Sequence, residues 1–430
     1  MASKYCFHEQ AAHDPSEAAD EMVRQLKELP WSVTAVIPGA ETGVLLADQL
    51  ATQLDVRNNG LKLSFARRNK YDMGETVRAA GVRAARQHCG HTWDDIESFL
   101  EDLKPSPFLC VAKPIQSAGS DDVIKCTSVA EVKGAFDKIN GAVNGLGVIN
   151  EGILVQEYLE GAEYVVDSVS RDGVHKVTAI WEYDKRSVNG ANFVYFGMTL
   201  LPATGPLAEA LAAYSDEVLD ALEIHNGPGH MEVKMCNGGP CLVEVGSRCH
   251  GGEGSWRAVA LECVGYDQIE CTLDAYLDSK AFEQLPKKPA VLQAHGCEVF
   301  LVARQSGVVR SLPGKVLCAN LASYRGAEWQ AKPGSFSSAT IDCFTRPGAV
   351  QLAHVDAEQL KADVATIRDH ESKGHLLDFE VVCATAPPAG CVVVVGHEAI
   401  IASDEYACLL LFAINESRFK DFLRLNLIGA

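Results

Sequence analysis

Two glutamates in neighbouring apolar segments have the positions of a metal site. Glu232 and Glu244 each lie inside an apolar run, and a glycine-rich turn joins the two runs. If Glu232 faces Glu244 across a hairpin, Cys236 pairs with Pro240, residues 237–239 form the loop, and both carboxylates share one face. Like charges held side by side repel unless a cation lies between them, so we expect a hard divalent ion. The alternative is an acidic strand face in water.

An arginine and a glycine-rich segment follow the second acid. Arg248 stands two residues beyond Gly246, where it can neutralise a phosphate or a developing oxyanion. Gly251 and Gly252 precede a long apolar helix expected over 256–277, so their amides would lie at a helix N-terminus and face a substrate carboxylate or an acyl phosphate. A glycine-rich turn without a ligand is the alternative.

Two upstream segments have residue types that suit a nucleotide. Lys113 ends an apolar strand, and the glycine and serines of the loop 114–122 let backbone amides approach phosphates. The strand 152–158 passes into a polar connection ending at Glu163, which suits an adenine edge and two ribose hydroxyls. A surface hairpin would explain the first segment equally well, and an ordinary strand with a charged edge would explain the second better when it is taken alone. The chain contains no GxxxxGK[ST] loop.

A strand pair rich in aromatic and charged residues, 181–186 with 192–195, is the expected substrate region. Lys185 or Arg186 would pair with a substrate carboxylate, and Tyr183 would orient it. A solvated hairpin with exposed aromatic residues is the alternative.

Hydrophobic spacing and turn residues predict a chain of mixed helices and strands. A strand over 31–37, a glycine turn and a helix over 44–54 open it as an α/β unit. Helices are also expected over 93–103, 129–139 and 207–222, with strands throughout 164–201. We expect four parts: an N-terminal α/β domain (1–104), a lid subdomain (105–165), a central catalytic subdomain (166–288) and a β-rich C-terminal subdomain (289–430).

Composition narrows the class of protein. The chain has 430 residues and a formal charge of −19, which repels a polyanion over most of its surface and excludes a nucleic-acid partner. The first residues lack the apolar core of a signal peptide, and no apolar run suffices to span a membrane. We expect a cytoplasmic enzyme. The 15 cysteines form no CxxC pair and suit reduced, buried thiols.

Taken in order, these features resemble the nucleotide and metal signature of the ATP-grasp ligases, over about residues 33–277. Within that superfamily the chain is most similar to the L-amino-acid (dipeptide) ligases, through Arg67–Lys70, His230–Lys234, the pair Glu244 and Arg248, and the tail segment Thr340–Gly348. The resemblance implies an α/β (α+β) protein with the ATP-grasp fold, a small N-terminal α/β subdomain and a C-terminal β-rich subdomain.

The resemblance also implies a role for each matching residue. The residues expected to bind ATP are Lys70, Lys113, Ser117, Gly119, Ser120, Gln156, Glu157, Leu159 and Glu163. The expected metal ligands are Glu232 and Glu244, and the expected catalytic residues are Arg248, Lys113, Gly251 and Gly252. We place substrate binding at Tyr183, Lys185, Arg186, His230, Ser255 and Trp256.

Two positions depart from the superfamily. Gly246 stands where many members place a metal-binding asparagine, and glycine has no side chain to offer. The segment before residue 31 is short and polar, so the first subdomain is expected to be reduced.

The expected reaction joins a carboxylate to an amine, between two amino acids or similar compounds, through an acyl phosphate with release of ADP and phosphate. ATP and Mg2+, or Mn2+, are the expected cofactors, and the small carboxylate and amine substrates are the expected partners of a homodimer. Two alternatives stay open. One is a biotin-carboxylase-like or purine-pathway carboxylase that uses bicarbonate, and the other is a nucleotide-binding module without turnover.

Overall fold

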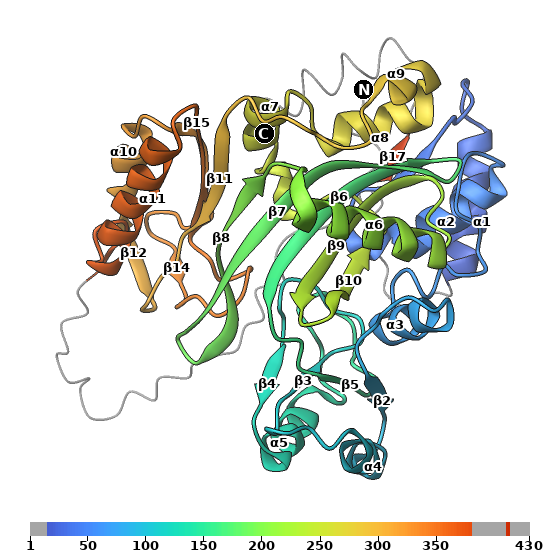
Figure 1. Cartoon of the computed structure of the whole chain (residues 1–430), viewed down its shortest axis with the longest axis horizontal. Helices are drawn as coiled ribbons and strands as arrows, with labels where there is room; N and C mark the ends of the chain where they lie inside the picture. Colours follow the sequence, from blue (N-terminus) through green and yellow to red (C-terminus); the bar gives the residue numbers. More distant parts are fainter. Residues whose placement is uncertain (1–14, 381–409, 413–430) are drawn as a thin grey trace.

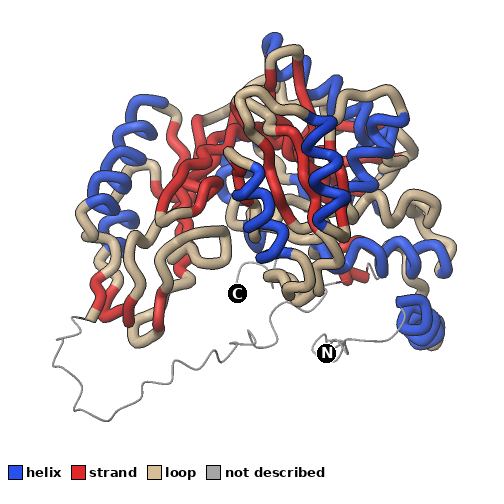
Figure 2. The backbone as a smooth tube through the Cα atoms, turned by 90° about the horizontal axis from the view of Figure 1, so that it is seen from below, coloured by secondary structure: helices blue, strands red, loops and turns tan. Residues whose placement is uncertain are grey.

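The structure is a computed structural model, and it describes residues 15–380 and 410–412. Strands run through the interior of the molecule and helices lie around them (Figures 1 and 2). The expectations for the first residues, 1–14, and for the end of the C-terminal region, 381–409 and 413–430, fall outside the described residues.

An eight-stranded antiparallel sheet forms the centre, with the strand order β10-β9-β6-β7-β8-β11-β15-β13. Its strands are β6 (Ala162–Arg171), β7 (Val174–Val188), β8 (Ala191–Leu201), β9 (Gly227–Cys236), β10 (Gly239–Gly246), β11 (His295–Phe300), β13 (Tyr324–Trp329) and β15 (Gly348–His354). The region expected to be a separate C-terminal subdomain from residue 289 onward thus supplies three strands to the central sheet.

Helices cover both faces of this sheet, because neighbouring strand residues point to opposite sides. Val166 packs with α6 (Gly205–Ala221) on one face, whereas Val165 packs with α7 (Arg257–Val264) on the other. α8 (Gln268–Leu277) and the short α9 (Ser279–Gln284) continue the second layer.

The single helix expected over 256–277 is wrong, because two helices occupy this region. Gly265 has a φ of +90° and ends α7, since a left-handed residue cannot continue a right-handed helix. The side chain of Asp267 then accepts hydrogen bonds from the first amides of α8, as an N-cap does.

A second, four-stranded antiparallel sheet lies apart from the first, at the bottom of Figure 1. It has the order β2-β5-β3-β4, and its elements are β2 (Gln87–Gly90), β3 (Cys110–Lys113), β4 (Ile124–Cys126), β5 (Ile153–Glu157), α4 (Trp93–Leu103) and α5 (Val129–Ile139). Ile96 and Leu100 of α4 share one core with Val155 of β5. The boundary expected between residues 104 and 105 therefore falls inside this unit.

Smaller units flank the central sheet. On the N-terminal side are α1 (Pro15–Lys27), β1 (Val36–Pro38), the short helix Glu41–Gly43, α2 (Val44–Gln53) and α3 (Lys70–Ala79). On the C-terminal side are β12 (Gly307–Ser311), α10 (Gly314–Ala319), β14 (Phe336–Ser337), α11 (Ala357–Ser372) and β16 (Asp378–Phe379). The strand expected over 31–37 is wrong in extent, since only β1 forms, and it pairs with β17 (Leu410–Phe412).

No helix in the described part of the chain is long and apolar enough to cross a lipid bilayer. The cysteines of this part are free thiols, and most but not all of them are buried as expected.

Candidate active site

The hairpin of β9 and β10 sets two buried glutamates side by side. Glu232 and Glu244 are register partners, so the predicted pairing of the two acids is confirmed. The predicted turn is wrong, because Cys236 pairs with Gly239 rather than with Pro240. The turn therefore has two residues, a length that asparagine followed by glycine favours.

A β-bulge reconciles the shorter turn with the pairing of the acids. In a regular ladder this turn would set Val243 opposite Glu232 and would point Glu244 to the other face. The register shifts between Leu242 and Glu244, so one residue of β10 is left unpaired. Consecutive residues Val243 and Glu244 consequently line the same cavity.

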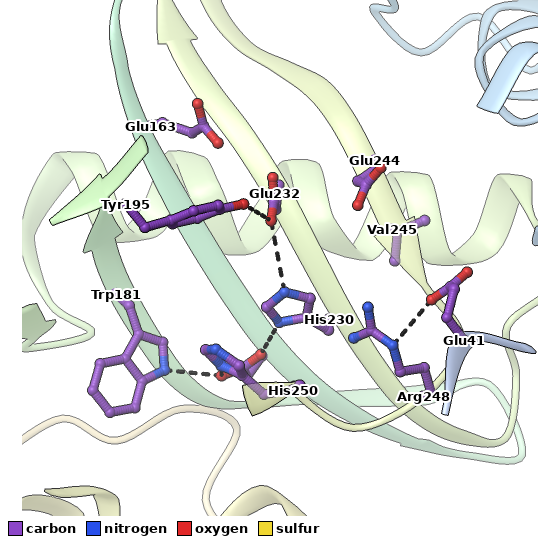
Figure 3. Close-up of polar contacts among 12 residues, drawn as sticks. Glu41, Glu163, Trp181, Tyr195, His230, Glu232, Glu244, Val245, Arg248 and His250 are labelled. Carbon is purple, nitrogen blue, oxygen red and sulfur yellow. Dashed lines mark hydrogen bonds and ion pairs between the residues drawn. The ribbon is translucent and has the colours of Figure 1, made fainter. Parts of the chain in front are cut away.

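The register of β6, β9 and β10 arranges polar side chains in rows on one face of the central sheet (Figure 3). From one end to the other, the rows are Glu163 with Lys234, Glu232 with Glu244, and Asp167 with His230 and Gly246. We call the region around the first two rows the phosphate end and the region around the third row the histidine end.

Lysines surround the acids of the phosphate end. The Nζ of Lys185 forms an ion pair with Glu163 and lies 3.4 Å from an oxygen of Glu232. Lys234 lies 3.7 Å from Glu163, and the hydroxyl of Tyr195 donates a hydrogen bond of 3.3 Å to Glu232. All five side chains thus form one buried network.

The acids at this end differ in their pKa values. Burial, together with the facing charges of Glu244 and Glu163, raises the pKa of Glu232 to about 7 despite the nearby Lys185. Burial acts in the same direction on Glu244, but Lys70 and Lys113 outweigh it and lower the pKa of that acid to about 2. Without a further cation, Glu232 therefore tends to hold a proton.

A cavity opens onto these acids and lies between the two sheets. Its lining includes every residue expected to bind ATP or metal: Lys70, Lys113, Ser117, Gly119, Ser120, Gln156, Glu157, Leu159, Glu163, Glu232 and Glu244. The Nζ of Lys70 lies 2.9 Å from Glu244. Burial and the charge of Lys70 lower the pKa of Lys113 to about 8, so an anion beside these lysines would be stabilised.

The loop over this cavity rests on the C-terminal region. The amide of Cys343 donates a hydrogen bond of 3.4 Å to the carbonyl of Gly119. A Cβ at Gly119 would lie 2.1 Å from the Sγ of Cys343, and its φ of +69° also favours glycine. The loop Ser117–Ser120 is therefore in close contact with a segment more than 200 residues away in the sequence.

Arg248 lies beyond the acids, where Glu41 of the N-terminal region holds its guanidinium. The Nε of Arg248 is 3.0 Å from Glu41, and Arg68 approaches the same acid at 3.7 Å. One guanidinium nitrogen of Arg248 also donates to the carbonyl of Cys249 at 3.0 Å. The side chain is 12% exposed, so it is fixed at the edge of the site.

Comparison with known proteins identifies the architecture. The ATP-grasp domain family matches residues 106–256. Dapdiamide A synthase of Enterobacter agglomerans is 32% identical over 346 residues, which are 80% of each chain. The chain belongs to the ATP-grasp ligases. An L-arginine-specific L-amino acid ligase of Bacillus subtilis is 21% identical over 218 residues, 50% of this chain and 52% of the other.

Solved structures of other ATP-grasp proteins share the fold. The L-amino acid ligase from Bacillus licheniformis has a TM-score of 0.67 at 20% identity, with 86% of both chains covered. An N5-carboxyaminoimidazole synthase from Aspergillus clavatus, in complex with ADP and 5-aminoimidazole ribonucleotide, has a TM-score of 0.61 at 14% identity, covering 86% of this chain and 88% of that one. The present ligase is thus an enzyme that uses ATP to form carbon–nitrogen bonds, and the interpretation as a module without turnover is set aside.

The structure explains why this ATP-grasp ligase has glycine at position 246. A Cβ there would lie 2.9 Å from the Cζ of Arg248 and 3.0 Å from a carboxylate oxygen of Glu41. The asparagine expected in many members would therefore displace the ion pair of these two residues. Close approach, rather than backbone conformation, selects the glycine here.

The expected substrate residues on β7 separate into two groups. Lys185 faces the cavity but is engaged by Glu163, so it belongs to the phosphate end. Tyr183 is close to it, with its ring 5.0 Å from that of Tyr195. Arg186 is directed elsewhere, since its side chain is 55% exposed and paired with its neighbour Asp184, and the structure does not place it in the site.

The segment that follows Arg248 differs from the expected start of a helix. Gly252–Gly254 is a short 3-10 turn, and α7 begins only at Arg257, so Gly251 and Gly252 do not lie at a helix N-terminus. Trp256 is buried beneath this segment, and its Nε1 donates to the carbonyl of Gly251 at 2.9 Å. Ser255 donates to the carbonyl of Gly252 at 2.9 Å. Both side chains thus support the segment.

Sequence reasoning assigned no role to four residues of this site, which are Glu41, Asp167, Tyr195 and His250. Asp167 is fully buried and directly follows the apolar run Tyr164–Val166, and an acid in such a place is itself a signal. Glu41 lies in a glycine-bearing turn with no pattern that distinguishes it.

Proposed function

We propose that this ligase joins two amino acids, or amino-acid-like compounds, by activating the carboxylate of one as an acyl phosphate and transferring it to the amine of the other. The observation that supports this most is the pair Glu232 and Glu244, facing each other beside a cavity lined by Lys70 and Lys113. The identity of 32% with dapdiamide A synthase points to the same class of reaction.

The residues of the phosphate end fit a divalent cation. Glu232 and Glu244 offer carboxylate oxygens, the ligands that Mg2+ prefers, and Mn2+ uses the same kind of donor. Burial and the facing acids raise the pKa of Glu232, and a bound cation would favour its ionised form. When bound there, the cation would neutralise charge on the nucleotide phosphates during phosphoryl transfer.

The protein's own residues would then act on ATP and on the two substrates. Lys70 and Lys113 would hold the phosphates of ATP, and the loop Ser117–Ser120 would cover them and exclude water, which otherwise hydrolyses an acyl phosphate. An oxygen of the substrate carboxylate would attack the γ-phosphorus as ADP leaves. Arg248 would stabilise the oxyanion that forms when the amine attacks the acyl carbon.

A screen for ATP-dependent phosphate release tests the proposal. The purified protein is incubated with ATP, Mg2+ and the twenty amino acids singly and in pairs, and the masses of the products are measured by mass spectrometry. We expect release that needs two compounds, with a product whose mass is their sum minus water. Release that depends on bicarbonate and yields a carboxylated amine would instead establish the carboxylase alternative and overturn this one.

A further inference from the structure

The histidine end contains a buried carboxylate that joins two imidazoles. Asp167 accepts hydrogen bonds from the Nδ1 of His230 at 2.9 Å and from the Nδ1 of His250 at 2.8 Å. The indole Nε1 of Trp181 donates a third at 2.8 Å. Asp167 is fully buried, and the proposed roles of the phosphate end do not use it.

These contacts define the state of the rings. Burial acts to raise the pKa of Asp167, but the two histidines outweigh it and hold that pKa below its usual range. An ionised carboxylate only accepts hydrogen bonds, so each Nδ1 carries a proton, and the neutral ring of His250 has its acceptor at Nε2. Within residues 15–380, His250 makes its ring hydrogen bond through Nδ1, and its Nε2 makes none.

The orientation of the His250 ring is fixed, and its neighbours determine its protonation state. Its ring stacks on Trp256 at 5.3 Å and meets Trp181 edge-on at 6.0 Å. The titratable groups that face it are Asp167 of β6, His230 of β9 and Glu298 of β11. Burial and the neighbouring His230 lower the pKa of His250, and they outweigh the opposite effect of Asp167 and Glu298. The ring is therefore neutral at neutral pH.

The position of His250 suits the second step of the reaction. It follows Arg248 by two residues and precedes Gly251, and Figure 3 shows its ring on the side of Glu232 that faces away from Glu163. The nucleotide and the metal would occupy the opposite end of the same face. An amine approaching the acyl carbon from the side opposite the phosphates would therefore pass this ring.

We propose that the Nε2 of His250, oriented by Asp167, accepts a proton from the attacking ammonium group of the second substrate. This inference rests on the proposed function, because it assigns a residue to its second step. The ammonium nitrogen gives one proton to His250 and attacks with the freed lone pair. The new C–N bond forms, the acyl C–O bond breaks, and phosphate leaves with that electron pair. The nitrogen's second proton goes to the departing phosphate.

A metal ion held by the same three residues is a weaker explanation of the cluster. The potential ligand atoms of Asp167, His230 and His250 lie within 4.8 Å of one another. However, both Nδ1 atoms and both carboxylate oxygens are already engaged with each other and with Trp181. A cation at the carboxylate would have to replace these hydrogen bonds.

The test compares two nucleophiles in the full-length enzyme. Hydroxylamine is largely unprotonated at neutral pH, so its attack on an acyl phosphate needs no base, whereas an amino acid arrives as an ammonium ion. For His250→Gln we expect amide formation to fall about 100-fold, while hydroxamate formation from the same acid and ATP stays within about threefold of the wild type. Asp167→Asn should act in the same direction through the misoriented ring.

The pH profile separates proton transfer from a structural role. Wild-type amide formation should fall at acid pH, as His250 becomes protonated, and should be flat above that. In His250→Gln it should rise about tenfold per pH unit, since only the free amine reacts. The matched control is His175→Gln, which removes another buried histidine, 3.1 Å from Asp220 and outside the site, and should change neither rate.

The outcomes distinguish this inference from the proposed function. If His250→Gln lowers both rates equally, or neither rate, the assignment of His250 is overturned while the ligase function stands. If the wild-type enzyme forms neither amide nor hydroxamate with any acid tested, the proposed function fails, and this inference fails with it.

Discussion

The two ends of the active-site face hold buried charge in different ways. At the phosphate end, three acids share long and movable lysine side chains, and one of the acids, Glu232, is left with its pKa raised to about 7. At the histidine end, the single acid Asp167 is satisfied by three rigid ring donors. In the first arrangement the ionised form of Glu232 is disfavoured, so a cation would stabilise it, whereas in the second the acid has all its partners and orients the rings.

Removal of an acid should break the phosphate end most severely. We expect Glu244→Gln to lower the rate of ADP formation by roughly a thousandfold, because a cation ligand contributes several kcal/mol to the transition state. The matched control is Glu182→Gln, an exposed acid on the same sheet, which should stay within twofold. A steady-state ADP assay measures both, and comparable rates for Glu244→Gln and the wild type would contradict the metal assignment.

Removal of a lysine should show how much the folded state depends on neutralisation of the acids at the phosphate end. Lys185→Met leaves Glu163 and Glu232 with less positive charge in a buried setting, and we expect a loss of about 3 kcal/mol in the free energy of unfolding. Arg186→Met, one residue further on but exposed, should cost less than about 0.5 kcal/mol. Urea unfolding of both variants is the measurement, and equal losses would show that the network is not buried.

Neutralisation of Glu232 should stabilise the enzyme while inactivating it. Because the pKa of this acid is raised on folding from 4.5 to about 7, its stabilising protonated form is present at low pH and is lost as the pH rises through about 7. Metal-free Glu232→Gln should therefore be more stable than the wild type at pH 8, by up to about 3 kcal/mol, and the gain should vanish near pH 4. Thermal unfolding at the two pH values tests the sign. Asp167→Asn should show no such gain, since the pKa of that acid is lowered.

A side chain at position 246 should disturb the ion pair of Arg248 and Glu41, which lies between the phosphate end and the histidine end. Gly246→Asn would push Arg248 away from Glu41, and we expect kcat to fall about tenfold although the added amide is a potential metal ligand. Gly190→Asn, in a hairpin turn with open space around it, is the control for the added side chain. Mg2+ titrations of the rate would contradict this account if the 246 variant bound the metal more tightly at undiminished kcat.

Local signals in the sequence were sufficient for several elements. The helices expected over 93–103 and 129–139 have these bounds in the structure, because their caps and apolar spacing are complete within the segments themselves. The strand that ends at Lys113 and the facing of Glu232 and Glu244 were also predicted correctly.

Features that depend on distant segments were not predictable in the same way. The contact of Cys343 with Gly119 and the ion pair of Glu41 with Arg248 join residues about 200 positions apart, and no local pattern connects them. The break at Gly265 is locally encoded, but the apolar residues on both sides of it continue the helical spacing and hide the break.

The unpaired residue in β10 has a bearing on how such enzymes are compared by sequence. If Val243 were absent, Leu242 would still oppose Val233 and the next acid would still oppose Glu232. A relative one residue shorter in this hairpin would thus keep both acids facing each other but lose the side chain of Val243 beside them. The number of residues separating the two acids is therefore a poor criterion for deciding whether a distant homologue retains the proposed metal site.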